Sequence, residues 1–270
     1  MTELTCVTRD GGKIKILFFE AKNSNLPLLL EMHGGGYYGG TASDDINLCE
    51  TLCNECGVNV ASVDYRHATK FTYPTATDDC CDALKYLIGN EKLDFDRSRI
   101  IPIGHSAGAN AAAVVSMQMQ EYVCAQILDY PWLDVRSVNR PKKAFGIPKL
   151  FLTYMAKKYF KGKGTRELIT ASPLLMNKEQ ASKMPRTLII TAGNDCLHVD
   201  GIDFYELLKK SGVSVEMKEY EKAVHGFIEM HYAGTLAKKC YWLRESAVAL
   251  QADYCRNFIS EVKNFAEEFK

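Results

Sequence analysis

Short runs of apolar residues recur along the chain and are separated by turn-forming residues. The first two runs, 4–9 and 13–20, flank Asp10-Gly11-Gly12, which predicts a β-hairpin. Further runs without strict polar–apolar alternation follow at 27–32, 58–64, 99–103, 124–128, 186–191 and 213–220. Runs of this kind are typical of strands in a parallel sheet that is covered on both faces.

Apolar residues between these runs recur at helical spacing. We expect helices over 76–88, over the alanine-rich stretch 107–117, over 202–210 with Asp200 as the N-cap, and over 250–269. Alternating strands and helices predict an α/β fold with a mostly parallel central sheet flanked by helices. The length of 270 residues fits a single domain spanning 1–270.

One interval, about 133–171, breaks this alternation. It contains an expected helix over 145–160, between flanks that carry proline and glycine. An insertion of this length in a compact domain is usually a lid or a binding segment, so we predict a small helical cap. An ordinary extra surface helix is the alternative.

The charge balance and the cysteines indicate which partners and which cellular location to expect. Lys plus Arg and Asp plus Glu both number 33, and no basic block is present, so we expect neither a nucleic-acid nor a membrane partner. The first residues do not read as an export signal, and the ten cysteines are therefore expected to be reduced thiols of a cytoplasmic protein. The oligomeric state stays open.

The segment 100–108 joins an apolar run to Gly104-His105-Ser106-Ala107-Gly108 and then to a helix. A serine on such a strand-to-helix turn exposes its hydroxyl, and the two glycines allow the chains to approach closely. Ser106 is therefore the candidate nucleophile. Pro102 does not fit, because proline inside a central strand loses a hydrogen bond of the ladder.

A second motif, His33-Gly34-Gly35-Gly36, follows the run at 27–32. Such a loop offers backbone N–H groups with no side chains in the way, as an oxyanion hole requires. A plain flexible turn is the alternative, and so is a phosphate-binding loop, although the residues that usually follow one are absent.

A serine nucleophile needs a base, and the base needs an acid to orient it. Asp195 lies just past the run at 186–191, and His225 lies in the loop after 213–220. The order Ser, Asp, His is the one expected when a serine follows a strand in this way. Less suitable competitors are Asp200 for the acid, and His198 or His231 for the base.

Together, these stretches resemble the hormone-sensitive-lipase-like group of α/β-hydrolases, which includes carboxylesterases and acetyl esterases. The matching segments are His33 to Tyr37, Asp64 to Arg66, Tyr73-Pro74, Gly104 to Gly108, Ala171 to Leu174, Asp195 and His225 to Phe227. The resemblance implies an acyl-enzyme on Ser106 and oxyanion N–H donors at Gly35, Gly36 and Ala107. Tyr37 and His105 are the expected substrate-binding residues.

The chain departs from this group in several places. His105 stands where Asp is frequent, Cys196 follows the acid where Pro is frequent, and Ala109 replaces a second glycine. Only 32 residues precede His33, so the usual N-terminal cap is nearly absent.

We therefore expect a serine hydrolase that cleaves short-chain carboxylic esters of small molecules, without a metal or another cofactor. An arylformamidase-like amide hydrolase and a carbohydrate O-deacetylase are the alternatives on the same triad. Gly104 to Ala109 also looks like the arylformamidases, although their oxyanion loop typically has two glycines before the aromatic residue.

Two alternative interpretations of the sequence place it in other classes of protein. Cys49, Cys53 and Cys56 have the spacing that binds a 4Fe–4S cluster in radical SAM enzymes, but they also follow a helical spacing, which favours buried thiols on a helix. A catalytically silent binding module on the same fold would be expected to have lost Ser106, Asp195 or His225, and all three are present.

Overall fold

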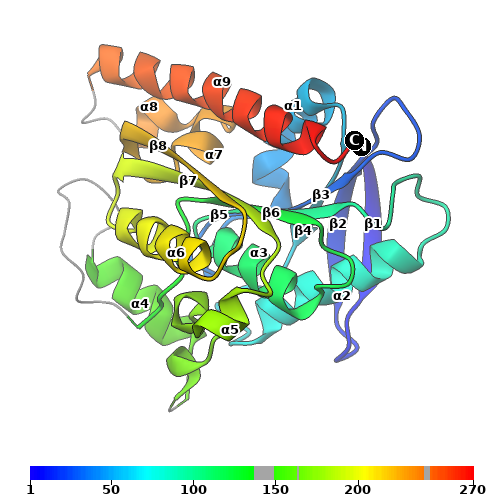
Figure 1. Cartoon of the computed structure of the whole chain (residues 1–270), viewed down its shortest axis with the longest axis horizontal. Helices are drawn as coiled ribbons and strands as arrows, with labels where there is room; N and C mark the ends of the chain where they lie inside the picture. Colours follow the sequence, from blue (N-terminus) through cyan, green and yellow to red (C-terminus); the bar gives the residue numbers. More distant parts are fainter. Residues whose placement is uncertain (137–148, 163, 240–243) are drawn as a thin grey trace.

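A central sheet of eight strands organises the computed structural model, which describes residues 1–136, 149–162, 164–239 and 244–270 (Figure 1). The strand order is β1-β2-β4-β3-β5-β6-β7-β8. The bounds are β1 Thr2–Val7, β2 Lys13–Phe19, β3 Leu28–Met32, β4 Asn59–Asp64, β5 Ile100–His105, β6 Ala125–Asp129, β7 Arg186–Asn194 and β8 Val215–Val224. The β1–β2 hairpin is antiparallel, β2 is also antiparallel to β4, and all later neighbours are parallel. The mostly parallel α/β sheet is confirmed.

Helices cover both faces of this sheet. The α-helices are α1 Ile46–Cys56, α2 Thr75–Gly89, α3 Ala107–Gln118, α4 Lys149–Tyr159, α5 Lys178–Ala181, α6 His198–Lys210, α7 Phe227–Tyr232, α8 Leu236–Lys239 and α9 Glu245–Glu267. Short 3₁₀ helices are η1 Ala42–Asp45, η2 Thr165–Glu167 and η3 Pro173–Leu175. Figure 1 shows α1, α7, α8 and α9 on one face and α2 to α6 on the other.

The side chains of β3 show how one strand contributes to the apolar cores on both faces of the sheet. Leu28, Leu30 and Met32 belong to the apolar core under α2, α3 and α6, whereas Leu29 belongs to the core under α1 and α9. All four are fully buried. A strand sends successive side chains to opposite faces, so a strand between two helical layers is mostly apolar, and Glu31 is the buried polar exception in β3.

Two helix boundaries differ from the expectation. Helix α6 begins at His198 rather than at 202, so Asp200 lies inside it and is not the N-cap. The Asp200 carboxylate instead accepts hydrogen bonds from the N–H groups of Leu133 and Asp134, at 2.9 and 2.8 Å. The Asp200 side chain therefore binds a distant backbone segment and does not cap the helix. Helix α9 likewise begins before 250, at Glu245.

The position of Pro102 has a structural explanation. The ladder between β5 and β6 changes register at this point, from the isolated bridge between Ile100 and Val123 to the pair of Ile103 with Ile127. The carbonyl of Ile100 accepts from Cys124, so the Pro102 nitrogen, two residues on, also faces β6. The missing N–H therefore falls where the ladder is already interrupted.

The segment between β6 and β7 carries α4, which matches part of the helix expected over 145–160; residues 145–148 lie outside the described ranges. The ring of Tyr159 stacks on that of Tyr37, with centroids 4.3 Å apart. Its hydroxyl oxygen accepts a hydrogen bond from the N–H of Ala76 at the start of α2. Helix α4 is thus joined to the loop after β3 and to α2.

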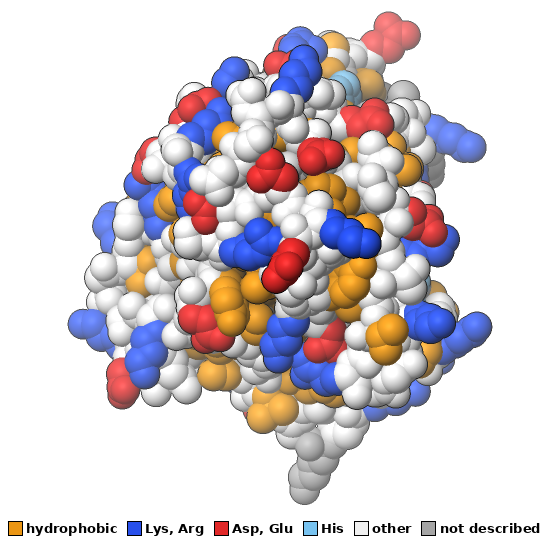
Figure 2. Space-filling model, turned by 90° about the vertical axis from the view of Figure 1, so that its right-hand side faces the viewer, with side chains coloured by type: hydrophobic (Ala, Val, Ile, Leu, Met, Phe, Trp, Pro, Cys, Tyr) orange, Lys and Arg blue, Asp and Glu red, His pale blue; other side chains and the backbone are white. Residues whose placement is uncertain are grey.

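The described surface carries a balanced mixture of charges on the face shown in Figure 2, where basic and acidic side chains are interspersed. Equal numbers of the two kinds along the sequence agree with this picture. Among the helices that the structure describes, none combines the length and the apolar character needed to cross a bilayer.

Candidate active site

The turn between β5 and α3 holds Ser106 in an unusual backbone conformation. Its φ and ψ are 58° and −112°, in a region that residues other than glycine rarely adopt. A Cβ atom on Gly104 would lie 2.3 Å from the carbonyl oxygen of Gly108, and one on Gly108 would lie 1.9 Å from that of Met32. The glycines are therefore required by close backbone contact.

Ser106, His225 and Asp195 form one chain of hydrogen bonds. Nδ1 of His225 lies 2.6 Å from Oδ2 of Asp195, and Nε2 of the same ring lies 2.9 Å from Oγ of Ser106. A carboxylate can only accept, so it holds the proton on Nδ1 and leaves Nε2 free to accept the serine proton. The second oxygen of Asp195 accepts from the N–H of Leu197 at 3.0 Å, which fixes the carboxylate.

The competing acid and bases are placed elsewhere. Nε2 of His198 lies 3.0 Å from Glu219, and Asp200 accepts from the backbone of the segment after β6. The ring of His231 contacts that of Tyr232 on α7, at 5.1 Å between centroids. Among these described candidates, the structure joins Ser106 to His225 and Asp195, the acid and base that the chain order favoured.

The environment of His225 favours its protonated form. Burial of the ring lowers its pKa, but the negative charge of Asp195, the hydrogen bond to it and the charge of Glu229 outweigh burial, and the net shift of the pKa is upward. The ring therefore binds a proton more readily than a free imidazole, which suits a general base.

The loop after β3 is shaped by glycines with positive φ. Gly35 has φ 118° and Gly36 has φ 65°. A Cβ on Gly35 would lie 2.0 Å from the carbonyl oxygen of Gly39, and that of Gly36 would lie 2.1 Å from Sδ of Met155 on α4. The N–H groups of Tyr38 and Gly39 bond to the Gly35 carbonyl, which closes the turn.

Three backbone donors around this loop are available to a ligand. Within the described residues, no hydrogen bond is found for the N–H groups of Gly35, Gly36 and Ala107. Ala107 is the first residue of α3, whose first N–H groups have no acceptor within the helix. These donors lie on the two loops that flank Ser106, as an oxyanion hole requires.

Tyr37 and His105 lie inside the protein, and neither has exposed surface. The hydroxyl of Tyr37 donates to Oδ1 of Asn110 at 2.7 Å. Nδ1 of His105 lies 2.9 Å from Oδ2 of Asp129. This burial argues against direct contact of either side chain with a substrate.

The pKa of His105 shows how polar the region beneath the nucleophile is. Burial alone would lower the pKa of this ring, but Asp129, Glu229 and Glu31 outweigh it and raise the pKa to about 10. The acidic groups around the residue next to the nucleophile thus offset the effect of burying its ring. This explains how a histidine is accommodated where the related group often has Asp.

Sequence reasoning missed Tyr130 and Glu229. Tyr130 follows β6 with a φ of 35°, its ring meets that of His225 edge to face at 5.1 Å, and its hydroxyl donates to Glu229. Glu229 lies on α7, four residues after His225, and its charge acts on the His225 ring. That spacing and the strand end at Asp129 were the available signals.

The cysteines of α1 are buried on a helix, as the helical spacing predicted. Cys49 contacts Glu31, Cys53 contacts the carbonyl of Phe19, and Cys56 contacts that of Ile259. The three sulfur atoms therefore face different neighbours. Among the described residues, no cluster of three or more His, Cys, Asp or Glu side chains has an arrangement that could hold a metal ion.

A family model described as the α/β-hydrolase fold matches residues 29–229. This span includes the nucleophile turn, the glycine loop, Asp195 and His225. The chain belongs to the α/β-hydrolase family.

Individual relatives of this hydrolase are esterases by name. The chain is 30% identical over 244 residues to an ethyl acetate hydrolase of Pseudomonas putida, covering 85% of this chain and 76% of the relative. It is 30% identical over 238 residues to an arylesterase of Saccharolobus solfataricus, covering 82% and 77%. A solved esterase structure from Pyrobaculum calidifontis superposes with a TM-score of 0.81 at 26% identity, covering 98% of this chain and 85% of the other.

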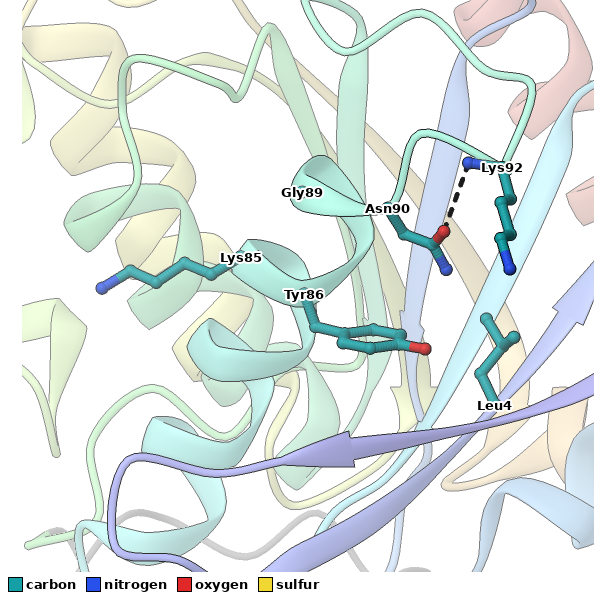
Figure 3. Close-up of a pocket in the computed structure, with 6 residues that line it drawn as sticks. All are labelled: Leu4, Lys85, Tyr86, Gly89, Asn90 and Lys92. Atoms are coloured by element: carbon teal, nitrogen blue, oxygen red, sulfur yellow. Dashed lines mark hydrogen bonds between the residues drawn. The ribbon is translucent and has the colours of Figure 1, made fainter.

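A surface pocket of about 590 Å³ lies between β1 and the end of α2, and none of the triad residues lines it (Figure 3). Its lining includes Leu4, Tyr86 and two lysines, Lys85 and Lys92. In the figure, Asn90 accepts a hydrogen bond from the N–H of Lys92. The lining contains no nucleophile and no base paired with one, so it does not compete with the Ser106 site.

Proposed function

We propose that this protein is a serine esterase that hydrolyses short-chain carboxylic esters through an acyl-enzyme on Ser106. The observation that carries the proposal is the hydrogen-bonded chain from Ser106 through His225 to Asp195. The names of the relatives support ester hydrolysis by a serine hydrolase.

Acylation begins at Ser106. His225 Nε2 takes the hydroxyl proton while Oγ attacks the ester carbonyl carbon, and the carbonyl oxygen becomes an oxyanion that accepts from Gly35, Gly36 and Ala107. Asp195 stabilises the resulting imidazolium and keeps it oriented. Collapse of the intermediate breaks the bond to the alcohol oxygen, which receives the proton from Nε2.

Deacylation repeats these steps with water. His225 removes a proton from the water molecule, the hydroxide attacks the acyl carbonyl, and the same N–H groups hold the second oxyanion. Collapse releases the carboxylic acid and returns the proton to Oγ of Ser106. These steps use groups of the protein and water.

The substrate class follows from the site and from the relatives. A small-molecule ester fits the proposed reaction, and relatives named for ethyl acetate and aryl ester hydrolysis do not favour the arylformamidase alternative. We further infer that the segment of about 133–171 acts as a small cap on a single domain, since Met155 of α4 contacts the loop of Gly36. A cytoplasmic location stays a prediction, supported by the free thiols of the described cysteines.

Covalent labelling tests the proposal directly. A fluorophosphonate probe should label the native protein, and Ser106→Ala should remove the label. Turnover across a panel of p-nitrophenyl esters, aryl amides and an N-formyl arylamine should show activity on the esters. An unlabelled native protein would contradict the serine mechanism, and preferential cleavage of the formamide would contradict the ester assignment.

A further inference from the structure

A second pocket of about 280 Å³ adjoins the proposed catalytic groups. Its wall includes Gly34 and Gly35 of the glycine loop, and Gly226, which directly follows His225. Further lining residues come from the loop after β3, from η1, from α7 and the segment after it, and from Lys239 at the end of α8. The pocket therefore shares Gly35 with the proposed oxyanion hole.

The charged groups of the pocket are mostly acidic. Asp44, Asp45 and Glu229 line it, and Lys239 is the basic residue among the lining side chains. Asp44 accepts from the hydroxyl of Thr41 at 2.9 Å, and Glu229 accepts from Tyr130. His33, which also lines the pocket, supplies no positive charge at neutral pH because burial lowers its pKa to about 4.

Asp45 is the acidic side chain in this pocket for which the described residues provide no hydrogen-bond or ion-pair partner. It is 2% exposed, it makes no capping hydrogen bond at the start of α1, and no hydrogen bond or ion pair to it is found within the described residues. Buried carboxyl groups are normally hydrogen-bonded or paired. Burial and the nearby negative charges of Glu31 and Glu229 raise the pKa of Asp45 to about 8, against the opposing positive charge of His105, so a cation placed next to Asp45 would favour its ionised form.

We propose that this pocket binds a positively charged ammonium group on the substrate, with Asp45 and Asp44 as its partners. The inference rests on the proposed esterase function, because it identifies the chemistry at the far end of the ester. A cation would pair with Asp45 and offset the negative charges of Asp44 and Glu229. A metal ion is the weaker occupant, since no metal-binding cluster of side chains is found within the described residues.

A pair of isosteric substrates measures the effect of charge alone. Acetylcholine and 3,3-dimethylbutyl acetate differ by a quaternary nitrogen in place of a carbon atom. Three acidic groups and one lysine line the pocket, so a cationic substrate should be favoured over its neutral isostere, and we expect acetylcholine to have a kcat/KM about 10-fold higher. A ratio of one or less in the native protein would overturn the proposal.

Variants then assign the preference to this pocket. Asp45→Asn keeps the shape of the side chain and should bring the ratio of the two kcat/KM values close to one, and Asp44→Asn should lower it by a smaller factor. Lys239→Gln removes the opposing charge and should raise the ratio, so one variant moves it in each direction. Glu91→Gln, at an exposed position outside the pocket, is the matched control. An unchanged ratio in folded Asp45→Asn protein would contradict the proposal.

A binding measurement separates this inference from the esterase assignment. Titration of choline into the Ser106→Ala protein by calorimetry should give binding that Asp45→Asn weakens. If choline binds but native protein hydrolyses no ester, the proposed function fails and the pocket assignment stands. If p-nitrophenyl acetate is hydrolysed but choline does not bind, the pocket assignment fails alone.

Discussion

Ser106 combines a rarely adopted backbone conformation with a hydroxyl that is already hydrogen-bonded to its base. Ser106→Ala removes the nucleophile and leaves the turn in place, so kcat should fall on the order of 10³-fold or more, with little change in melting temperature. Initial rates on p-nitrophenyl acetate and a thermal melt measure both effects. Near-native activity in the purified variant would contradict the assignment of Ser106 as the nucleophile.

Asp195 and Asp200 are both buried, but they have different partners. Asp195→Asn cannot hold the proton on Nδ1 of His225, so kcat should fall by roughly 10²- to 10⁴-fold while the fold persists. Asp200→Asn loses an acceptor for two backbone N–H groups and should instead lower the melting temperature. The reverse pattern would mean that Asp200 is the catalytic acid.

Glu229 offers a test of the electrostatics around His225. The charged groups that face this ring are Asp195, beyond β7, and Glu229, on α7, and both raise its pKa. Neutral His225 is the active base, so activity falls as pH drops through this pKa. Glu229→Gln removes one negative charge and lowers the pKa of His225, and the acidic limb of the kcat/KM profile should therefore move to lower pH by up to about one unit.

Tyr130→Phe is the matched control for that shift. It removes the hydroxyl that donates to Glu229 but leaves the carboxylate charge in place. The limb should stay close to its native position, while kcat falls because the ring that contacts His225 edge to face is less firmly held. A limb that moves equally in both variants would show that the Glu229 charge does not act on His225.

Among the secondary-structure elements, α3 joins the parts of the site through Asn110. This fully buried side chain accepts from Tyr37, and its Nδ2 donates to the carbonyls of Trp132 and Ala171, at 2.8 and 2.9 Å. Asn110→Ala leaves these three groups unpaired and should lower the free energy of unfolding by about 3 kcal/mol. Chemical denaturation measures this, and Asn54→Ala on the exposed side of α1 should change it by less than about 0.5 kcal/mol. A neutral Asn110→Ala would contradict this role.

Local patterns predicted the elements well, and the exceptions have physical reasons. The strand run at 27–32 and the helix over 107–117 match β3 and α3 to within a residue, because each pattern reflects the burial of that one element. The predicted start of α6 was wrong because the Asp200 carboxylate binds a distant backbone segment and does not cap the helix. Similarly, the partner of Tyr130 is 99 residues away, and no local spacing encodes such a contact.

For the molecule taken together, the order of motifs along the chain predicted which residues meet. Parallel strands place their carboxyl ends at one edge, so residues after β5, β7 and β8 converge although they are far apart in sequence. The burial of side chains next to the motifs was harder to predict. Tyr37 and His105 were expected to contact substrate because they adjoin the motifs, but the cap segment and the buried carboxylates enclose them.

The packing of the segment around α4 is expected to limit the length of the acyl chain. Met155, Tyr159 and Phe160 are buried against the rest of the protein, whereas the neighbouring lysines Lys157, Lys158 and Lys161 are exposed. A long acyl chain speeds the reaction only if it gains apolar contact, at about 0.8 kcal/mol per buried methylene. These buried side chains already pack inside the fold, so we expect little apolar surface to remain for acyl carbons beyond the first few. We expect kcat/KM to be highest for p-nitrophenyl acetate to butyrate and to decline beyond about six carbons, with no activation at a lipid surface. A series from acetate to palmitate, measured below and above the solubility limit, checks both points, and a palmitate rate equal to the acetate rate would reveal a deep acyl tunnel.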